Sequence, residues 1–453
     1  MASAPPVTDD GLVEPLPRID IKPLLAKLWP LGAKGAVSAD DIAEAISHFF
    51  TNQVSDVQAG ALLMCLHFTG LDRQAEVLAK TAECMLKSAA KIDQNGLRAA
   101  IEGKRRKEGG YGGGLVCLCL CCWSPFRIGV LLTSHSPCFK VDIVGTGGDS
   151  HNTFNISTTS SILASSLLLI AKHGNKASTS KSGAADLLAC MQPQPPQIGR
   201  IRPDTIADLY RETNYGFLFA PVFHPGMRHV APIRRELPWR TIFNLVGPLA
   251  NPTDLRGEDR AGEPLLEARM IGVARKDIGP VFAQALELAG ARKAMVVCGD
   301  EELDEISCAG DTLCWRIQPD PADPAKSVTE HFRLHPRDFG LPAHALSEVS
   351  PGKAPEENAA ILRRILAGEV PDDDPILHFV LINTAALFVV SGICEAESSD
   401  LGFGDDGVVI TERGPGGGRW KEGVRRARWA VKSGEAARQW DAFVQVTNRF
   451  TDY

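Results

Sequence analysis

Hydrophobic positions in the first hundred residues recur with the period of an α-helix. After a Pro- and Asp-rich start over residues 1–18, which predicts a flexible tail, Leu24, Leu25 and Leu28 mark one apolar helical face. Ser38 opens the run SADDIAEAISHFF and Ser55 opens SDVQAGALLMCLHF. A serine followed by acidic residues is a typical helix start, because its hydroxyl accepts an orphan backbone N–H. Residues 19–103 therefore predict a small all-helical domain.

From residue 141 onward, short apolar runs alternate with helical stretches. The runs at 141–144, 168–171, 268–273 and 293–297 predict strands, and 159–167, 278–288, 356–366 and 376–391 predict helices. This alternation is typical of a large α/β domain with a mainly parallel central sheet and helices on both faces. Segments rich in Pro, Gly and charge at 191–204, 252–263, 317–326, 350–356 and 413–419 predict surface loops.

Composition limits the classes of function. A length of 453 residues fits two or three domains, and 44% hydrophobic residues exclude wholesale disorder. With 55 acidic against 48 basic residues, the chain carries a net charge of −7, which argues against nucleic-acid binding. The N-terminus has no basic start or apolar run, and the apolar stretches at 115–123 and 376–394 are too short or too polar to predict a membrane span. We expect a cytoplasmic protein without a membrane partner.

A glycine-rich segment follows the first predicted strand of the α/β part. Residues 145–149 read GTGGD, and Asn155 to Thr158 then open a helix. Closely spaced glycines let backbone N–H groups approach an anion, and a helix N-terminus adds its dipole. Phosphate or pyrophosphate is the natural ligand, although a turn without a ligand is an equal alternative. The spacing matches neither the P-loop nor the dinucleotide fingerprint.

Two cationic segments come next. Residues 172–182 read KHGNKASTSKS, in which lysines and hydroxyls alternate in a way that suits a second anion contact; a polar surface loop is the alternative. An otherwise apolar stretch then carries His224, Arg228, His229, Arg234, Arg235 and Arg240. An arginine there could clamp a carboxylate in bidentate fashion, or it could pair locally with Glu236.

An acidic pair follows the apolar run AMVVCG. Asp304 and Glu305 are adjacent carboxylates, and Mg2+ is usually held by one or two carboxylates together with substrate phosphates. An acidic surface loop is the alternative. The spacing shows no catalytic triad.

Together these segments resemble the anthranilate phosphoribosyltransferase family of tryptophan biosynthesis. The motifs GTGGD, NIST, KHGN, HP-M-H-AP-RREL, RTIFN--GPL-NP and LDEIS appear in order, and the resemblance covers the chain except residues 1–18 and about 116–140. It implies a nucleoside phosphorylase/phosphoribosyltransferase-like fold, with the helical domain completed by about 225–262 and the α/β domain formed by 141–224 and 263–453. It also implies Mg2+ as cofactor, a homodimer, and transfer of the phosphoribosyl group from phosphoribosyl pyrophosphate (PRPP) to the amine of anthranilate.

The resemblance assigns residues to three subsites. PRPP would be bound by Gly145, Gly148, Asp149, Thr153, Asn155, Ile156, Ser157, Thr158, Lys172, His173, Gly174, Asn175, Lys176 and Ser180. Anthranilate would be bound by Gly145, Asn175, His224, Arg234 and Pro248, and Mg2+ by Ser157, Asp304 and Glu305. The catalytic set would be Lys172, Arg234, Asp304 and Glu305. Three residues depart from the family pattern: Lys176 replaces an arginine, Ala184 a serine and Glu302 a glycine.

The implied mechanism depends on positioning and charge. C1 of the ribose becomes oxocarbenium-like as Mg2+-bound pyrophosphate leaves, and the aromatic amine already offers a lone pair, so no strong general base is required. Two alternatives stay open: a nucleoside phosphorylase of the related fold, and a catalytically inactive chain.

The second alternative arises from residues 116–140, VCLCLCCWSPFRIGVLLTSHSPCFK. Five of the twelve cysteines lie there, and removing the 25 residues joins GGYGGGL to VDIVGTGGD. Val116-Cys117 can be encoded by GTATGT, a common fungal intron start, Leu132-Thr133 can encode a branch point, and Lys140 can end in AG. We interpret the segment, within a linker at 104–140, as a retained intron. A tolerated surface insertion, a zinc site and a palmitoylated loop are the alternatives. We expect its apolar side chains to find no core, which favours aggregation.

Overall fold

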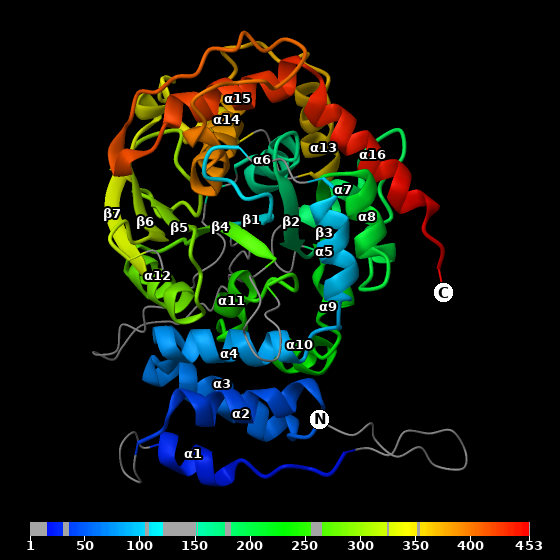
Figure 1. Cartoon of the computed structure of the whole chain (residues 1–453). Helices are drawn as coiled ribbons and strands as arrows, with labels where there is room; N and C mark the ends of the chain where they lie inside the picture. Colours follow the sequence, from blue (N-terminus) through cyan, green and yellow to red (C-terminus); the bar gives the residue numbers. More distant parts are fainter. Residues whose placement is uncertain are drawn as a thin grey trace, which may run out of the picture.

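The computed structural model describes residues 16–29, 36–104, 108–120, 151, 153–176, 183–254, 265–323, 326–350 and 354–452. The predicted strand at 141–144, the glycine segment 145–149 and Ser180 lie outside these ranges. In Figure 1 a bundle of helices lies below a larger α/β unit, whose C-terminal helices cover the top of the view.

The bundle begins with α1 (Lys22–Leu28), α2 (Ala39–Phe50), α3 (Asp56–Thr69) and α4 (Ala75–Lys87). Ser38 caps α2: its Oγ accepts the Asp41 N–H at 3.1 Å, and the Asp41 carboxylate accepts the Ser38 N–H at 3.0 Å. Ser55 caps α3 by accepting the Gln58 N–H. Both predicted helix starts are confirmed.

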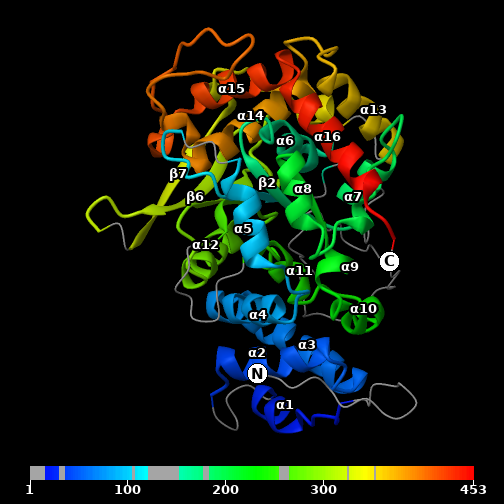
Figure 2. The ribbon, with the colours of Figure 1, turned by 45° about the vertical axis from the view of Figure 1, so that its right-hand side comes forward.

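Distant segments join the bundle. α10 (Met227–Glu236) packs against α2 and α3, and α11 (Phe243–Val246) packs against α4. By contrast, α5 (Gln94–Glu102) packs against α8 (Ile206–Glu212) and lies beside the sheet (Figure 2). The short helix α9 (Ala220–Phe223) connects the sheet to α10.

The α/β unit is built on a seven-stranded sheet in the order β3-β2-β1-β4-β5-β6-β7. Its strands are β1 (Leu115–Leu120), β2 (Leu169–Gly174), β3 (Tyr215–Phe219), β4 (Leu266–Gly272), β5 (Ala294–Gly299), β6 (Thr312–Pro319) and β7 (Ser327–Leu334). The first five strands in this order are parallel, and β6 and β7 extend the sheet as an antiparallel edge. The predicted mainly parallel sheet is confirmed.

Both faces of the sheet are covered by helices. Along β4, Ala268 and Met270 enter one core, whereas Ile271, and Val273 just after the strand, enter the other. The first core contains α6 (Ile156–Ala164), α14 (Pro375–Ser391), α15 (Trp420–Lys432) and α16 (Glu435–Arg449), with α7 (Ala184–Ala189) and α13 (Pro355–Leu366) at one side. The second core contains α12 (Gly279–Leu288) and the bundle. None of the helices described is long and apolar enough to cross a membrane.

The predicted helices 159–167, 278–288, 356–366 and 376–391 are present as α6, α12, α13 and α14, with shifted ends. The strands β3, β6 and β7 were not predicted, and residues 317–319, expected in a loop, end β6. β6 pairs with β5 and β7 pairs with β6, so their extended form is stabilised by ladder hydrogen bonds that local periodicity does not reveal.

One expectation is wrong for the start of its segment. Residues 116–140 were expected to find no core; residues 121–140 lie outside the described ranges, but Val116, Cys117 and Leu118 lie in β1 at the centre of the sheet, and Cys117 is only 2% exposed. The reason is that the apolar run follows Leu115 directly and finds a strand partner on each side, β2 and β4.

Candidate active site

The first side of the site is the N-terminus of α6. Asn155 caps this helix: its Oδ1 accepts the Thr158 N–H at 3.2 Å, and its own N–H donates to Asn358 Oδ1 at 3.2 Å. Thr153 lies two residues before the cap and is partly exposed, whereas Ile156, Ser157 and Thr158 are buried. The predicted helix opening at this motif is confirmed.

Lys172 connects β2 to this helix. Its buried ammonium donates to Ser157 Oγ at 3.2 Å and to the Leu118 carbonyl of β1 at 3.3 Å. The structure therefore brings together a lysine and a serine that the sequence separates by fourteen residues. Gly174 ends β2, and a Cβ there would lie 2.7 Å from Phe217 Cζ, so only glycine fits. Asn175 is partly exposed, and Lys176 is exposed.

The acidic pair lies beyond the carboxyl end of β5. Asp304 and Glu305 are both buried, and Asp304 is 3% exposed. Burial raises the pKa of Asp304 to about 6, against smaller opposing effects of a hydrogen bond to its own backbone and of the charges of Arg240 and His151. Its Oδ2 atom is buried without a hydrogen-bond partner among the described residues. A buried carboxylate oxygen without a partner fits a hard cation such as Mg2+.

The acidic pair is not a complete metal cage. Within the described ranges, no three His, Cys, Asp or Glu side chains lie close enough to hold an ion together. Mg2+ typically takes only one or two carboxylates and completes its shell with waters and substrate phosphates. Lys172 and Asp304 both act electrostatically on the Cys119 thiol near the end of β1, whose pKa is raised chiefly by burial.

Two buried histidines lie beside each other, His173 in β2 and His224 directly after α9. The rings of His173 and His224 lie 5.0 Å apart, and His224 Nε2 donates to the Ala250 carbonyl at 3.0 Å. Burial and then His224 lower the pKa of His173 to about 3, and burial lowers the pKa of His224 to about 4. Both rings are therefore neutral at pH 7. Pro248 is buried in the short turn Gly247–Leu249, which follows α11.

Arg234 lies on α10, with its guanidinium 5.9 Å from the centre of the Phe243 ring. Burial lowers its pKa to about 10, which still leaves it charged at neutral pH. A half-buried cation above an aromatic ring suits a planar carboxylate ligand.

The structure also shows where the residues that depart from the family pattern lie. Glu302 has φ +62°, the left-handed conformation that favours glycine, which explains why a glycine is usual there. Ala184 is the first residue of α7, next to Gly174. Sequence reasoning missed His151, whose Nε2 donates to the Glu301 carbonyl at 2.9 Å and which is near Asp304. Its place directly after GTGGDS was the available signal.

Comparison with known proteins agrees with this arrangement. A helical bundle domain of a glycosyl transferase family matches residues 22–89, and the a/b domain of a glycosyl transferase family matches residues 139–437. These two matches define the class: a glycosyl transferase that combines a helical bundle with an α/β domain.

The particular family follows from its relatives. The chain is 34% identical to the anthranilate phosphoribosyltransferase of Schizosaccharomyces pombe over 91% of this chain and 94% of that protein, and 33% identical to the Saccharomyces cerevisiae enzyme over 85% of each. A solved structure of the Saccharomyces cerevisiae enzyme in complex with PRPP and Mg matches with a TM-score of 0.69 and 28% identity, covering 94% of this chain and 96% of that one. The chain belongs to the anthranilate phosphoribosyltransferase family.

Proposed function

We infer that this chain transfers the phosphoribosyl group of PRPP to the amine of anthranilate, giving N-(5-phosphoribosyl)anthranilate and pyrophosphate in tryptophan biosynthesis. The observation that carries the inference is the 34% identity to the Schizosaccharomyces pombe enzyme over 91% of the chain. Lys172 and Arg234 supply positive charge for anionic groups, and Asp304 and Glu305 supply carboxylates for a cation. His173 and His224 supply a neutral surface, and this reaction needs all three features.

We assign PRPP to the space between α6, the end of β2 and the acidic pair. The α6 N-terminus offers backbone N–H groups and a positive dipole end to a phosphate, and Lys172 adds a buried cation beside Ser157. The roles of Gly145, Gly148, Asp149 and Ser180 remain predictions, because these residues lie outside the described ranges.

We assign Mg2+ to Ser157, Asp304 and Glu305, as the yeast enzyme has been solved with PRPP and Mg. When bound, Mg2+ supplies positive charge that stabilises departing pyrophosphate. The raised pKa of Asp304 supports this assignment, because a carboxylate buried without sufficient counter-charge is stabilised by a cation.

We assign anthranilate to the wall formed by His173, His224, Pro248 and Arg234. Neutral imidazoles and a proline present a surface of low charge to an aromatic ring, and Arg234 provides the cation for its carboxylate. A structure of the yeast enzyme with 4-fluoroanthranilate shows that this relative binds such a ligand. The amine lone pair attacks C1 without a general base, so the walls act by orienting it.

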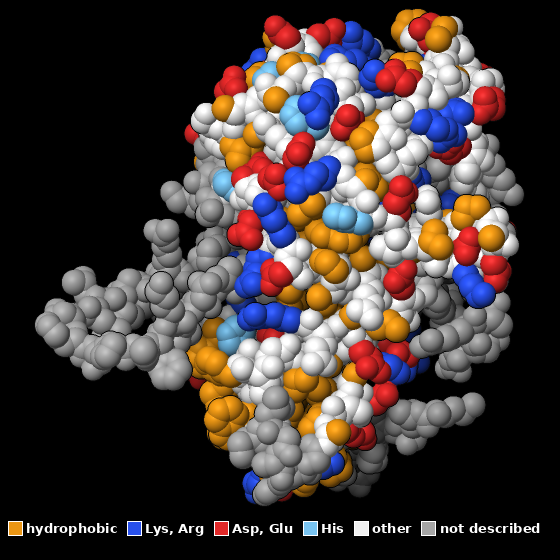
Figure 3. Space-filling view, turned by 90° about the vertical axis from the view of Figure 1, so that its left-hand side faces the viewer, with side chains coloured by type: hydrophobic (Ala, Val, Ile, Leu, Met, Phe, Trp, Pro, Cys, Tyr) orange, Lys and Arg blue, Asp and Glu red, His pale blue; other side chains and the backbone are white. Residues whose placement is uncertain are grey.

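We propose that the protein is a cytoplasmic homodimer that associates through α3, in a helical domain formed by 19–103 and about 225–262. Val57, Met64 and Phe68 share one face of α3; Val57 is 83% and Phe68 54% exposed. Trp29, at the end of α1, is also exposed. Hydrophobic side chains gather in the lower part of Figure 3, where the bundle lies. Sedimentation of Val57→Glu with Phe68→Glu should show monomers where the parent chain is dimeric; an unchanged mass would exclude this face.

The activity itself is tested by the loss of anthranilate fluorescence in the presence of PRPP and Mg2+. The chain as given and a chain lacking residues 116–140 are assayed in parallel, because the retained-intron interpretation concerns only the first. Activity in neither form, together with phosphate-dependent cleavage of a nucleoside, would instead support a nucleoside phosphorylase.

A further inference from the structure

One polar residue lies in the buried stripe of α13. The buried residues of this helix follow the helical period and are Asn358, Ala359, Leu362, Ile365 and Leu366. Four of them are apolar, whereas Asn358 carries an amide and is only 3% exposed. Burying an amide without hydrogen bonds is unfavourable, so an apolar side chain would be the ordinary choice at this position. The asparagine therefore indicates a specific polar partner.

That partner is the segment that opens α6. Asn358 Oδ1 accepts the Asn155 N–H at 3.2 Å, across 203 positions of the chain. Its Nδ2 donates to the Ala354 carbonyl at 3.1 Å, so both ends of the amide are bonded. The neighbouring Phe154 N–H donates to the Val349 carbonyl at 2.9 Å. Two consecutive N–H groups before α6 are thus held by α13 and by the turn that precedes it.

These contacts leave one N–H group of the first turn of α6 available. Asn155 Oδ1 accepts the Thr158 N–H at 3.2 Å. The Ile156 N–H donates to the Phe154 carbonyl at 2.7 Å. Between them, the Ser157 N–H has no hydrogen-bond partner among the residues that the structure describes. A free N–H at a helix N-terminus is a donor for an anion.

The conformation of Asn155 acts on this donor. Asn155 is the N-cap of α6, with φ −72° and ψ 79°, and so sets the direction in which the first turn begins. The Lys172 ammonium donates to Ser157 Oγ at 3.2 Å, which places a cation beside the free N–H. Donors stabilise an anion best when they are held in place before it binds. A residue that fixes Asn155 therefore acts on the phosphate site without touching the ligand.

The same helix also supports the second segment to which PRPP is assigned. α13 packs against α7, beside which it lies in Figures 1 and 2. At the start of α7, the Ala185 N–H donates to the Asn175 carbonyl at 3.3 Å. At its end, the Cys190 thiol donates to Glu356 Oε1 of α13 at 3.6 Å. α13 is therefore a common support for the α6 N-terminus and for the segment that follows β2.

We propose that Asn358 is a positioning residue for PRPP: it fixes the backbone of Asn155 so that α6 presents the Ser157 N–H to a phosphate oxygen. The inference rests on the proposed function, because it takes PRPP as the ligand of this site. Asn358 acts on PRPP binding and leaves anthranilate binding unchanged, since the residues assigned to anthranilate belong to other elements.

Hydrogen exchange tests the link between the helices without any ligand. Asn358→Leu has a similar volume and removes both hydrogen bonds of the amide, whereas Asn358→Asp keeps an oxygen that can accept the Asn155 N–H. Resolved by mass spectrometry with fragmentation, the Asn155 amide should exchange at least tenfold faster in Asn358→Leu than in the parent chain. In Asn358→Asp its exchange rate should stay close to that of the parent. An unchanged rate in Asn358→Leu would overturn the proposal.

Calorimetric titration with PRPP in the presence of Mg2+ tests the positioning role. The two chain forms, with and without residues 116–140, are titrated, and the substitutions are made in a form that binds PRPP. Asn358→Leu should weaken PRPP binding at least tenfold. Asn448→Leu is the matched control, because Asn448 Nδ2 makes the same kind of contact in α16, to the Pro195 and Val444 carbonyls at 3.0 and 2.9 Å. It should lower the unfolding midpoint and leave PRPP affinity unchanged.

Steady-state kinetics separates positioning from a general loss of structure. Asn358→Leu should raise the KM for PRPP at least tenfold and change the KM for anthranilate less than twofold. Equal rises of both KM values, or a PRPP affinity equal to that of the parent, would refute the positioning role. If neither parent form binds PRPP while Asn358→Leu still speeds exchange at Asn155, the proposed function fails together with the PRPP assignment, and only the link between α13 and α6 stands.

Discussion

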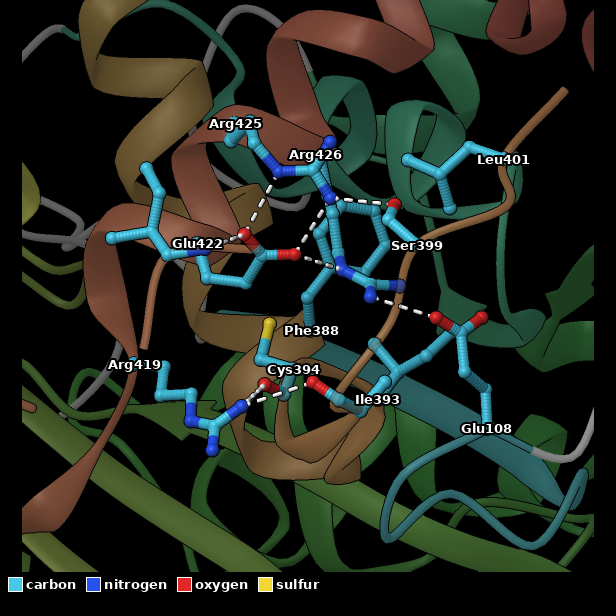
Figure 4. Close-up of polar contacts among 12 residues, drawn as sticks. Glu108, Phe388, Ile393, Cys394, Ser399, Leu401, Arg419, Glu422, Arg425 and Arg426 are labelled. Carbon is cyan, nitrogen blue, oxygen red and sulfur yellow. Dashed lines mark hydrogen bonds and ion pairs between the residues drawn. The ribbon is translucent and has the colours of Figure 1, made fainter. Parts of the chain in front are cut away.

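Removing the guanidinium of Arg426 should destabilise the protein more than any exposed charge change. Arg426 is fully buried in α15, where its Nε donates to Glu422 Oε1 at 2.7 Å and its Nη2 to Glu108 Oε1 at 2.7 Å (Figure 4). Glu422 is buried as well. Burial alone would raise the pKa of Glu422, but hydrogen bonds from Arg425, the Ile410 N–H and Arg426 outweigh it, and the pKa is lowered.

The magnitude follows from what Arg426→Met leaves behind. Breaking a buried ion pair by removing one partner costs about 3–5 kcal/mol. Glu422 keeps the two hydrogen bonds from Arg425, at 2.8 Å each, and Glu108 is partly exposed to solvent, so we expect about 3 kcal/mol, the lower end. At about 2.1 cal/mol/K per residue, a chain of 453 residues has an unfolding entropy near 1 kcal/mol/K, and Tm should fall by about 3 °C.

Thermal unfolding followed by circular dichroism measures this shift. Arg438→Met is the matched control, because Arg438 is largely exposed and its pair with Glu435 should contribute at most about 0.5 kcal/mol. Arg426→Met combined with Glu422→Gln should recover part of the loss, since no buried carboxylate is then left with half its partners. Equal Tm values for the two single variants would refute the reasoning.

The other predictions concern the site. Arg234→Ala should raise the KM for anthranilate much more than the KM for PRPP in steady-state kinetics, and equal effects would remove Arg234 from the anthranilate wall. Asp304→Ala together with Glu305→Ala should abolish turnover at ordinary Mg2+ concentrations, and near-normal activity would argue against the metal role. Because burial raises the pKa of Asp304 to about 6, its contribution to stability without Mg2+ is full below pH 4 and is lost as pH rises through 6. Denaturation in EDTA should therefore show Asp304→Asn gaining stability over the parent chain across this window, by about 3 kcal/mol at pH 7.5; a pH-independent difference would contradict it. Glu302→Gly should stabilise the protein by about 1 kcal/mol, since it relieves the left-handed backbone, whereas Glu302→Ala, measured in the same denaturation assay, should not.

Much of the fold could be predicted because its signals are local. Ser38, Ser55 and Asn155 cap their helices by accepting the N–H of the residue three positions on. Such contacts form within one turn, so the residue order alone reveals them. The alternation of strands and helices likewise predicted a mainly parallel sheet. By contrast, β3, β6 and β7 depend on partners in other strands, and no short window of sequence contains those partners.

For the same reason, only part of the candidate site could be predicted from the sequence. Ordered motifs indicated the residues, and the structure brings Lys172 to Ser157 and His173 to His224. The motifs did not indicate that Asp304 is buried with an oxygen that has no hydrogen-bond partner among the described residues, or that both histidines are neutral. Burial depends on the whole packed molecule, and these charge states are set by burial.

The difference between what the residue order determines and what the tertiary structure decides is clearest at β1. The residue order already contains two apolar runs, 116–120 and 141–144, and each has a composition suited to a buried strand. Their local patterns do not distinguish them. In the folded chain residues 116–120 pair with β4, directly after the Leu115 N–H donates to the Leu265 carbonyl, and Val116 also pairs with β2. Residues 141–144 lie outside the described ranges. Strand pairing joins Val116 to Ile170 and Ala268, 54 and 152 positions away, so occupancy of the central position is a property of the tertiary structure.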